Sequence, residues 1–157
     1  MLTTGDMAPD FTLPCDDSGT GETTITLSAL RPNKVVLYFY PRDDTPGCTK
    51  EAIGFTEHLD AFKAAKCVVI GISKDTIAKH GKFRTKHDLG VILASDADSD
   101  VCEQFGVWQE KSMYGKNFMG IQRATFLIGA DGTILRDWPK VRVPGHVEDV
   151  LKTVQEV

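Results

Sequence analysis

The fold is decided by the stretch VVLYFYPRDDTPGC at residues 35–48. It opens with an unbroken run of β-branched, apolar and aromatic residues, which is typical of a strand buried on both faces of a helix-covered sheet. Pro41 ends this run. Pro46 favours the opening position of a helix, because its φ is already helical and its missing N–H is not needed there. The stretch therefore predicts a buried strand, a short loop and a helix that begins close to Cys48.

Apolar spacing and β-branched runs predict further elements on both sides of this stretch. Phe55, Leu59 and Phe62 recur at i, i+4 and i+7 and predict one amphipathic helix over residues 48–65. Further strands are predicted at residues 24–27, 68–72, 91–94, 124–128 and 133–136. Further helices are predicted at residues 77–86, 99–105 and around 147–154. Turn residues support two hairpins, namely Asp17, Ser18, Gly19 and Gly21 in the first and Asp131-Gly132 in the second.

This order of elements predicts an α/β protein with a thioredoxin-like fold. The expected architecture is a mixed central sheet flanked by helices on both faces, with an N-terminal β-hairpin extension. No linker, repeat or low-complexity stretch interrupts the 157 residues, so we expect a single domain over residues 1–157.

Charge and hydropathy narrow the range of partners. A net charge of −4 gives no basic field, which argues against nucleic acid or an anionic membrane as a partner. The longest apolar run, near residues 35–39, is too short to span a bilayer. Residues 1–14 carry no positive charge and no apolar core of a secretory signal. We therefore expect a cytoplasmic protein.

The four cysteines are Cys15, Cys48, Cys67 and Cys102. No two of them form a C-x-x-C pair, and none has zinc-ligand spacing to another cysteine or to a histidine. In a reducing compartment we expect all four to stay reduced, and we expect neither a metal nor a cofactor.

Cys48 differs from the others because it is predicted to lie in the first turn of a helix that follows a buried strand. Unpaired N–H groups and the positive end of the helix dipole both stabilise a thiolate at such a place. A helix N-terminus with a cationic neighbour can lower a cysteine pKa from about 8.5 to roughly 3.5–7.5. The alternative interpretation is an inert cysteine that simply begins a helix, but strand, loop and helix start all favour a reactive thiol.

Thr45 lies three residues before Cys48, where a dithiol exchange protein would carry its second cysteine. A threonine cannot form a disulfide, which argues against such a protein. Its hydroxyl can hydrogen-bond to a peroxide oxygen or to the thiolate, and it can equally act as the N-cap of the helix.

The motif P-x-x-x-T-x-x-C at residues 41–48 resembles the peroxiredoxin signature. The longer stretch YPRDDTPGCTKE at residues 40–51 is similar to the bacterioferritin-comigratory (BCP, or Q-type) subfamily. The resemblance runs nearly end to end, through GDMAPDF at 5–11, VIGISKD at 69–75, YGK at 114–116 and GIQRATFLI at 120–128.

This resemblance implies an antioxidant oxidoreductase, a thiol-dependent peroxidase that maintains cell redox homeostasis. Cys48 would attack hydrogen peroxide or an organic hydroperoxide and become a sulfenic acid. Arg123 would stabilise the thiolate and hold the peroxide. Pro41 would shield the thiolate from water, and Glu51 would orient the arginine. Each has a plainer interpretation: Pro41 as a strand end, Glu51 as a helix-start carboxylate and Arg123 as a surface side chain.

The sequence departs from the family at the resolving cysteine. Many members carry one five residues after the first, where this chain has Ile53, and others carry one in a later helix, where residues 82–86 contain none. We therefore expect a one-cysteine mechanism that depends on thioredoxin, on glutaredoxin with glutathione, or on a low-molecular-weight thiol. The alternative is resolution by Cys15, in a mobile polar stretch, by Cys102 on a short helix, or by Cys67 at the start of a buried strand.

Other functions receive less support. A disulfide reductase needs two thiols, and a non-catalytic holdase or binding module would leave Cys48 an ordinary thiol. His58, His80, His87 and His146 are scattered and are interpreted as solvated side chains, as are the charged segments 79–87 and 110–116. The resemblance favours a monomer or weak homodimer.

Overall fold

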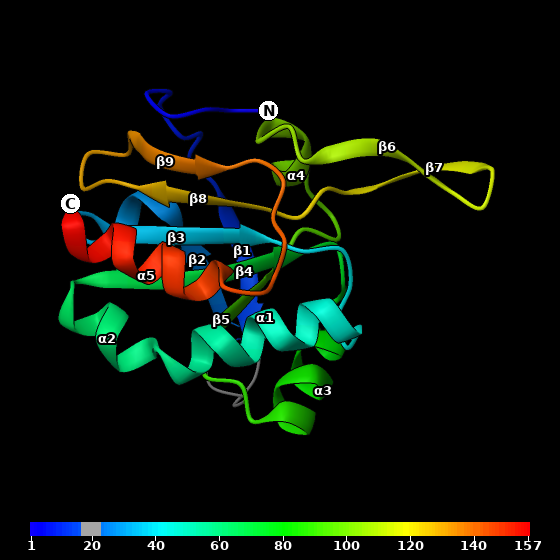
Figure 1. Cartoon of the computed structure of the whole chain (residues 1–157), viewed down its shortest axis with the longest axis horizontal. Coiled ribbons are helices and arrows are strands. Elements are labelled where there is room, and N and C mark those ends of the chain that lie inside the picture. Colours follow the sequence, from blue (N-terminus) through cyan, green and yellow to red (C-terminus); the bar gives the residue numbers. More distant parts are fainter. Residues whose placement is uncertain (17–22) are drawn as a thin grey trace.

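The computed structural model describes residues 1–16 and 23–157 (Figure 1). Within these residues, one mixed sheet has the strand order β2-β1-β5-β4-β3-β8-β9, and β6 pairs with β7 in a separate ribbon. The strands of the sheet are β1 (Thr12–Asp16), β2 (Thr23–Thr26), β3 (Lys34–Phe39), β4 (Cys67–Ser73), β5 (Ile92–Ser95), β8 (Ala124–Ile128) and β9 (Ile134–Trp138). The ribbon consists of β6 (Trp108–Met113) and β7 (Lys116–Ile121).

The helices cover both faces of this sheet. They are the 3₁₀ helix η1 (Leu27–Leu30), α1 (Pro46–Glu57), α2 (Leu59–Ala64), α3 (Ile77–His87), α4 (Val101–Gln104) and α5 (His146–Glu156). Side chains of α1, α2, α3 and α5 share one apolar cluster, whereas those of α4 belong to the cluster on the opposite face. Figure 1 shows α4 and the N-terminus on one side of the sheet and α1 and α2 on the other. The predicted mixed sheet with helices on both faces is thus confirmed.

β3 lies at the centre of the sheet, as its apolar run predicts. It pairs in parallel with β4 and antiparallel with β8. Leu37 and Phe39 belong to the cluster on one face, whereas Val36 and Tyr38 belong to the cluster on the other, and all four are fully buried. Because both faces are covered, neither set of alternating side chains needed to be polar.

The N-terminal hairpin is also present, with β1 and β2 antiparallel from Thr12↔Thr26 to Cys15↔Thr23. Its predicted turn residues Asp17, Ser18, Gly19 and Gly21 lie outside the described residues. The expectation that Cys15 lies in a mobile polar stretch is wrong, because β1 also pairs with β5 and buries Cys15 in the core.

The helix predicted over residues 48–65 is two helices, since the α-helical ladder is interrupted at His58. The N–H of His58 donates to the carbonyl of Phe55 at 3.2 Å, an i→i+3 bond that tightens the chain. Phe55 and Phe62 nevertheless reach the same apolar cluster. The apolar spacing thus identified the buried side chains but not the break.

The two charged segments expected to be solvated differ in outcome. Residues 110–116 are exposed as expected, apart from half-buried Lys111, and form half of the β6–β7 hairpin, which projects from the body in Figure 1. Its two turn residues, Tyr114 and Gly115, have φ values of 53° and 77°, so Gly115 supplies one of two left-handed positions. In residues 79–87 the expectation is wrong for one side of α3, where His80 and Arg84 are buried. Among the described residues, no helix combines the length and apolarity needed to cross a membrane.

Gly71 is expected to be essential for the packing beneath α1. It lies opposite Tyr38 in the β3–β4 pair, and a Cβ on Gly71 would lie 2.5 Å from Tyr38 Cζ. The Tyr38 ring cannot swing away, because it stacks on Phe55 of α1 at a centroid distance of 4.7 Å. Gly71→Ala should therefore lower the free energy of unfolding by about 1–3 kcal/mol, measured by urea denaturation.

Gly81→Ala is the matched control for this substitution. A Cβ on Gly81, within α3, would lie 3.5 Å from Asp16 Oδ2, an ordinary contact. Alanine also favours a helix interior over glycine, so Gly81→Ala should keep or raise the stability. Equal midpoints for Gly71→Ala and the wild type would contradict the packing argument.

Candidate active site

Cys48 occupies the third position of α1. A short loop joins the start of this helix to the carboxyl end of β3. β8 runs antiparallel to β3, and its first residue, Ala124, pairs with Phe39, the last residue of β3. Arg123, which directly precedes β8, is thereby brought to the same end of the sheet as Cys48. This pairing explains how two residues far apart in the sequence meet in one site.

The guanidinium of Arg123 binds Cys48 and Glu51 at the same time. Its Nη2 donates to Cys48 Sγ at 3.2 Å, and its Nη1 donates to Glu51 Oε1 at 2.8 Å. Burial disfavours the charge of Arg123, but Glu51 and Cys48 outweigh this effect and raise its pKa. Cys48 is only 1% exposed, so bulk water scarcely reaches the sulfur that contacts this cation at the start of α1.

Gly47 makes room for this contact. A Cβ on Gly47 would lie 3.1 Å from Arg123 Nη2, closer than side chains ordinarily pack. The glycine before Cys48 thus lets the guanidinium approach the sulfur from the side of the helix start. The sequence analysis did not identify Gly47, because the crowding arises only when Arg123 arrives from β8.

Glu51 is fully buried one turn along α1 from Cys48. Burial raises the pKa of Glu51 from 4.5 to about 7, although Arg123 opposes the shift. Its second oxygen, Oε2, has no hydrogen-bond partner among the described residues and lies 4.0 Å from His146 Nε2. Glu51 is therefore held on one side only, by the arginine.

His146 is part of this buried environment, and the expectation that it is a solvated side chain is wrong. Its Nε2 lies 2.9 Å from Thr125 Oγ1, and its ring packs edge-on against Phe55 and Trp138. Burial lowers the pKa of His146 to about 4, so the imidazole is neutral near neutral pH. The spacing does reveal it, since His146 precedes the buried Val150 of α5 by one turn.

Thr45 and Pro41 lie on the loop between β3 and α1. Thr45 is the N-cap residue of α1, but its side chain does not cap the helix; its hydroxyl donates to the carbonyl of Arg42 at 3.0 Å. Thr45 and the exposed Pro41 line one side of a cleft of about 580 Å³, and the β6–β7 hairpin lines the other. The hairpin wall is both cationic and apolar, with Lys111, Trp108, Phe118 and Met119, and Lys74 adds a second cation from outside the hairpin.

The other three cysteines lie away from Cys48. Cys67 pairs with Lys34 at the opposite end of the parallel β3–β4 pair, about 17 Å of strand from the loop. Cys15 is on β1, three strand spacings or about 14 Å from β3, and Cys102 is on α4 across the sheet. Burial raises the pKa of Cys67 to about 12 and that of Cys102 further still, so both stay thiols.

Comparison with known proteins identifies relatives of this chain. The AhpC/TSA family matches residues 4–136. A putative peroxiredoxin bcp of Coxiella burnetii is 50% identical over 147 residues, which cover 94% of this chain and 95% of the relative. The solved PrxQ of Xylella fastidiosa is similar with a TM-score of 0.91 at 36% identity, covering 99% of this chain and 97% of that one.

A bacterioferritin comigratory protein of Xanthomonas campestris is similar with a TM-score of 0.85 at 38% identity, covering 93% of this chain and 90% of that one. That protein was solved as trapped intermediate and ligand complexes, which bear on its alkyl peroxide reduction activity. The likeness to these solved structures confirms the predicted thioredoxin-like fold.

Gly47→Ala is expected to push the guanidinium of Arg123 away from Cys48, because the flexible arginine end moves more easily than the helix start. The contact between Arg123 and the sulfur should then weaken, and the rate at which Cys48 reacts with hydrogen peroxide should fall by about tenfold, the scale of one charge-assisted hydrogen bond. Rapid mixing with hydrogen peroxide, referenced to Cys48→Ser, measures this rate. Lys50→Ala, an exposed change on the same helix, is the control, and equal oxidation rates in both variants would contradict the prediction.

Replacing Glu51 should change how stability depends on pH. The pKa of Glu51 is about 7 in the folded chain against an ordinary value of 4.5, so this carboxyl takes up a proton on folding between these values, and its contribution to stability falls as pH rises. His146, with a folded pKa of about 4 against 6.5, acts in the opposite direction between those values. In Glu51→Gln, of these two contributions to the pH dependence of stability, only that of His146 is left.

The variant should therefore gain stability relative to the wild type as the pH rises from about 4.5 to about 7. Urea unfolding across this range measures the difference. A difference between the two proteins that does not change with pH would show that the Glu51 carboxyl is not desolvated as described.

Proposed function

Because this chain belongs to the AhpC/TSA family, among the Bcp or Q-type peroxiredoxins, and is a thiol-dependent peroxidase, we propose that Cys48 is the cysteine that reduces the hydroperoxide. The observation that carries the proposal is the 3.2 Å contact between Arg123 Nη2 and Cys48 Sγ at the start of α1. In this place a cation and a helix N-terminus act on one sulfur.

The chemistry is a displacement at oxygen. The Cys48 thiolate attacks the terminal oxygen of the hydroperoxide, an S–O bond forms and the O–O bond breaks. The departing alkoxide or hydroxide takes up a proton and leaves as an alcohol or water. Cys48 is thereby oxidised to a sulfenic acid, and the peroxide is reduced.

Neighbouring residues assist this displacement in distinct ways. Arg123 stabilises the thiolate and, with its remaining N–H donors, the negative charge that develops on the peroxide oxygens. Glu51 fixes the plane of the guanidinium through the 2.8 Å bond to Nη1. The Thr45 hydroxyl donates to the Arg42 carbonyl, which leaves its lone pairs to accept from the hydroperoxide O–H. Pro41 covers the approach to the sulfur at the edge of the cleft.

Both hydrogen peroxide and organic hydroperoxides are proposed as substrates. The cleft beside Thr45 is large enough for more than hydrogen peroxide, and Trp108, Phe118 and Met119 give it apolar walls. The alkyl peroxide reduction activity of the Xanthomonas campestris relative supports the organic class.

A one-cysteine cycle is the proposed route back to the thiol. An external thiol attacks the sulfenic acid, expels water and forms a mixed disulfide, and a second thiol then releases Cys48. The distances of Cys15, Cys67 and Cys102 from the loop support this route over an internal disulfide. Thioredoxin, or glutaredoxin with glutathione, is the proposed reductant in a cytoplasmic monomer or weak homodimer.

The decisive experiment treats the reduced protein with one equivalent of hydrogen peroxide and measures its intact mass, with and without a sulfenic-acid trap. Wild type, Cys48→Ser and the triple variant Cys15→Ser/Cys67→Ser/Cys102→Ser are compared. We expect a trappable gain of one oxygen in the wild type and in the triple variant but not in Cys48→Ser.

The other outcomes separate the parts of the proposal. A loss of two hydrogens that disappears in the triple variant would replace the one-cysteine route by an internal disulfide. Oxygen gain that persists in Cys48→Ser would move the reaction to another cysteine.

A further inference from the structure

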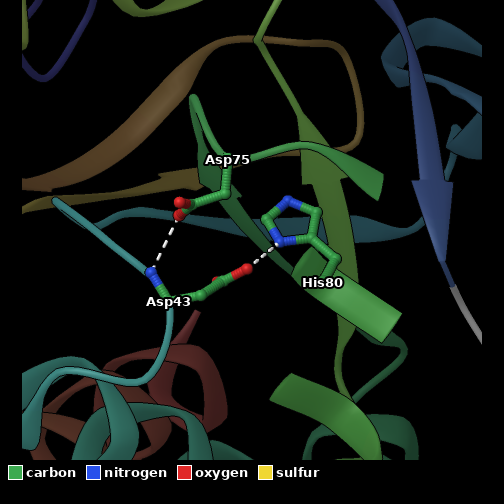
Figure 2. A group of neighbouring side chains, drawn as sticks. All are labelled: Asp43, Asp75 and His80. Carbon is green, nitrogen blue, oxygen red and sulfur yellow. Dashed lines mark hydrogen bonds and ion pairs between the residues drawn. The ribbon is translucent and has the colours of Figure 1, made fainter. Parts of the chain in front are cut away.

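The loop that carries Thr45 and leads to Cys48 is anchored to α3 through a contact between Asp43 and His80. His80 of α3 is fully buried, and its Nδ1 lies 2.6 Å from Asp43 Oδ2. The backbone N–H of Asp43 donates to Asp75 Oδ2 at 2.8 Å, and Tyr40 Oη donates to Asp43 Oδ1 at 2.6 Å. Figure 2 shows the Asp43 carboxylate directed toward the imidazole and its backbone nitrogen directed toward Asp75.

The hydrogen bonds of His80 determine how many protons the pair holds. Its Nε2 lies 3.0 Å from the carbonyl oxygen of Ala94, which can only accept, so Nε2 carries a proton. The contact between Nδ1 and Asp43 Oδ2 needs a second proton, and its length of 2.6 Å makes it a short, strong hydrogen bond. The pair thus holds two protons, one on Nε2 and one in the contact between Nδ1 and Oδ2.

Asp43, Asp75 and His80 also place three ligand atoms within 4.8 Å of one another, the spacing of a metal site. Both nitrogens of His80 are already engaged, however, and Asp75 Oδ2 accepts from Ser73 Oγ at 2.7 Å as well as from Asp43. No imidazole lone pair is left to bind a cation in this arrangement. The cluster is an anchor for Asp43.

Hydrogen bonds connect the backbone beside Asp43 to the first turn of the helix that carries Cys48. The carbonyl of Arg42, just before it, accepts the hydrogen bond of the Thr45 hydroxyl. The carbonyl of Thr45 in turn accepts from the N–H of Thr49 at 2.9 Å and so begins the helix that carries Cys48. A displacement of Asp43 would therefore displace the first turn of α1 relative to Arg123.

We propose that His80 is a positioning residue that, through Asp43, sets the balance between a closed and an open state of the Cys48 loop. The proposal rests on the proposed role of Cys48. In the closed state Cys48 meets Arg123 and reacts with peroxide. Because Cys48 is 1% exposed there, an external thiol reaches the sulfenic acid only when the loop opens. The His80–Asp43 pair therefore favours the reaction of Cys48 with peroxide and restrains the reduction of the sulfenic acid by the external thiol.

The two steps should respond to the loss of the pair in opposite directions. Reduction of the sulfenic acid depends on the open fraction, so His80→Ala and Asp43→Ala should accelerate it by roughly tenfold to hundredfold, the range expected for a lost charge-assisted buried contact. Oxidation by peroxide depends on the closed fraction and should fall only as far as that fraction falls. Over-oxidation, which competes with reduction, should decrease by the same factor as reduction accelerates.

Asp43→Asn provides the conservative rescue. An asparagine Oδ1 can accept from Tyr40, and its Nδ2 can donate to Nδ1 of a neutral His80 whose Nε2–H still bonds to Ala94. The geometry of the anchor is then kept without a carboxyl group. Both rates in Asp43→Asn should stay within about threefold of the wild type, on the scale of one neutral hydrogen bond exchanged for a charged one.

The test is a pair of rapid-mixing experiments on the full chain. The reduced protein is mixed with hydrogen peroxide, and the freshly formed sulfenic acid is mixed with 2-mercaptoethanol. Arg84→Lys is the matched control, because Arg84 forms a second buried ion pair one turn along α3, with Asp16 rather than with the loop. The Arg84→Lys variant should be less stable than the wild type, but its rates of oxidation and reduction should both stay near those of the wild type.

Faster reduction in Asp43→Ala, with rescue in Asp43→Asn and no effect in Arg84→Lys, would support the proposal even if His80→Ala failed to fold. Equal slowing of both steps, or acceleration in Arg84→Lys as well, would overturn it. If wild-type Cys48 did not react with peroxide at all, the proposed function would fail instead, and the two failures are therefore distinguishable.

Discussion

The site depends on a partly buried cation, the guanidinium of Arg123, which is hydrogen-bonded to both Cys48 and Glu51. A thiolate and a carboxylate buried within one turn of helix would repel each other, and both would favour their protonated forms. The planar fork of arginine satisfies both at once because its donors point in fixed directions. The room for that fork is provided by the absence of a side chain at Gly47.

The environment of Glu51 limits how strongly it can neutralise this cation. Its second oxygen faces His146, whose pKa is lowered to about 4 by burial, so no second positive charge reaches the carboxylate near neutral pH. Burial of a carboxylate with one partner is costly. The same guanidinium therefore serves Glu51 as its one hydrogen-bond partner among the described residues and contacts the sulfur as well.

The reactive loop lies between two polar clusters of different character. On the side of β8, Arg123 and Glu51 act on the sulfur directly. On the side of α3, His80 and Asp43 hold the backbone that precedes it.

The sequence by itself determined the architecture and the place of Cys48 at a helix start. The unbroken run of residues 35–40 can be buried only between two layers, and the proline-flanked loop places Cys48 at a helix start, because both signals are local. Tertiary structure alone decided the rest: the burial of His80 and His146, the isolation of Cys15 from Cys48, and the crowding at Gly47. These depend on which strands pair and which helix faces turn inward, and such contacts join residues whose spacing along the chain carries no signal.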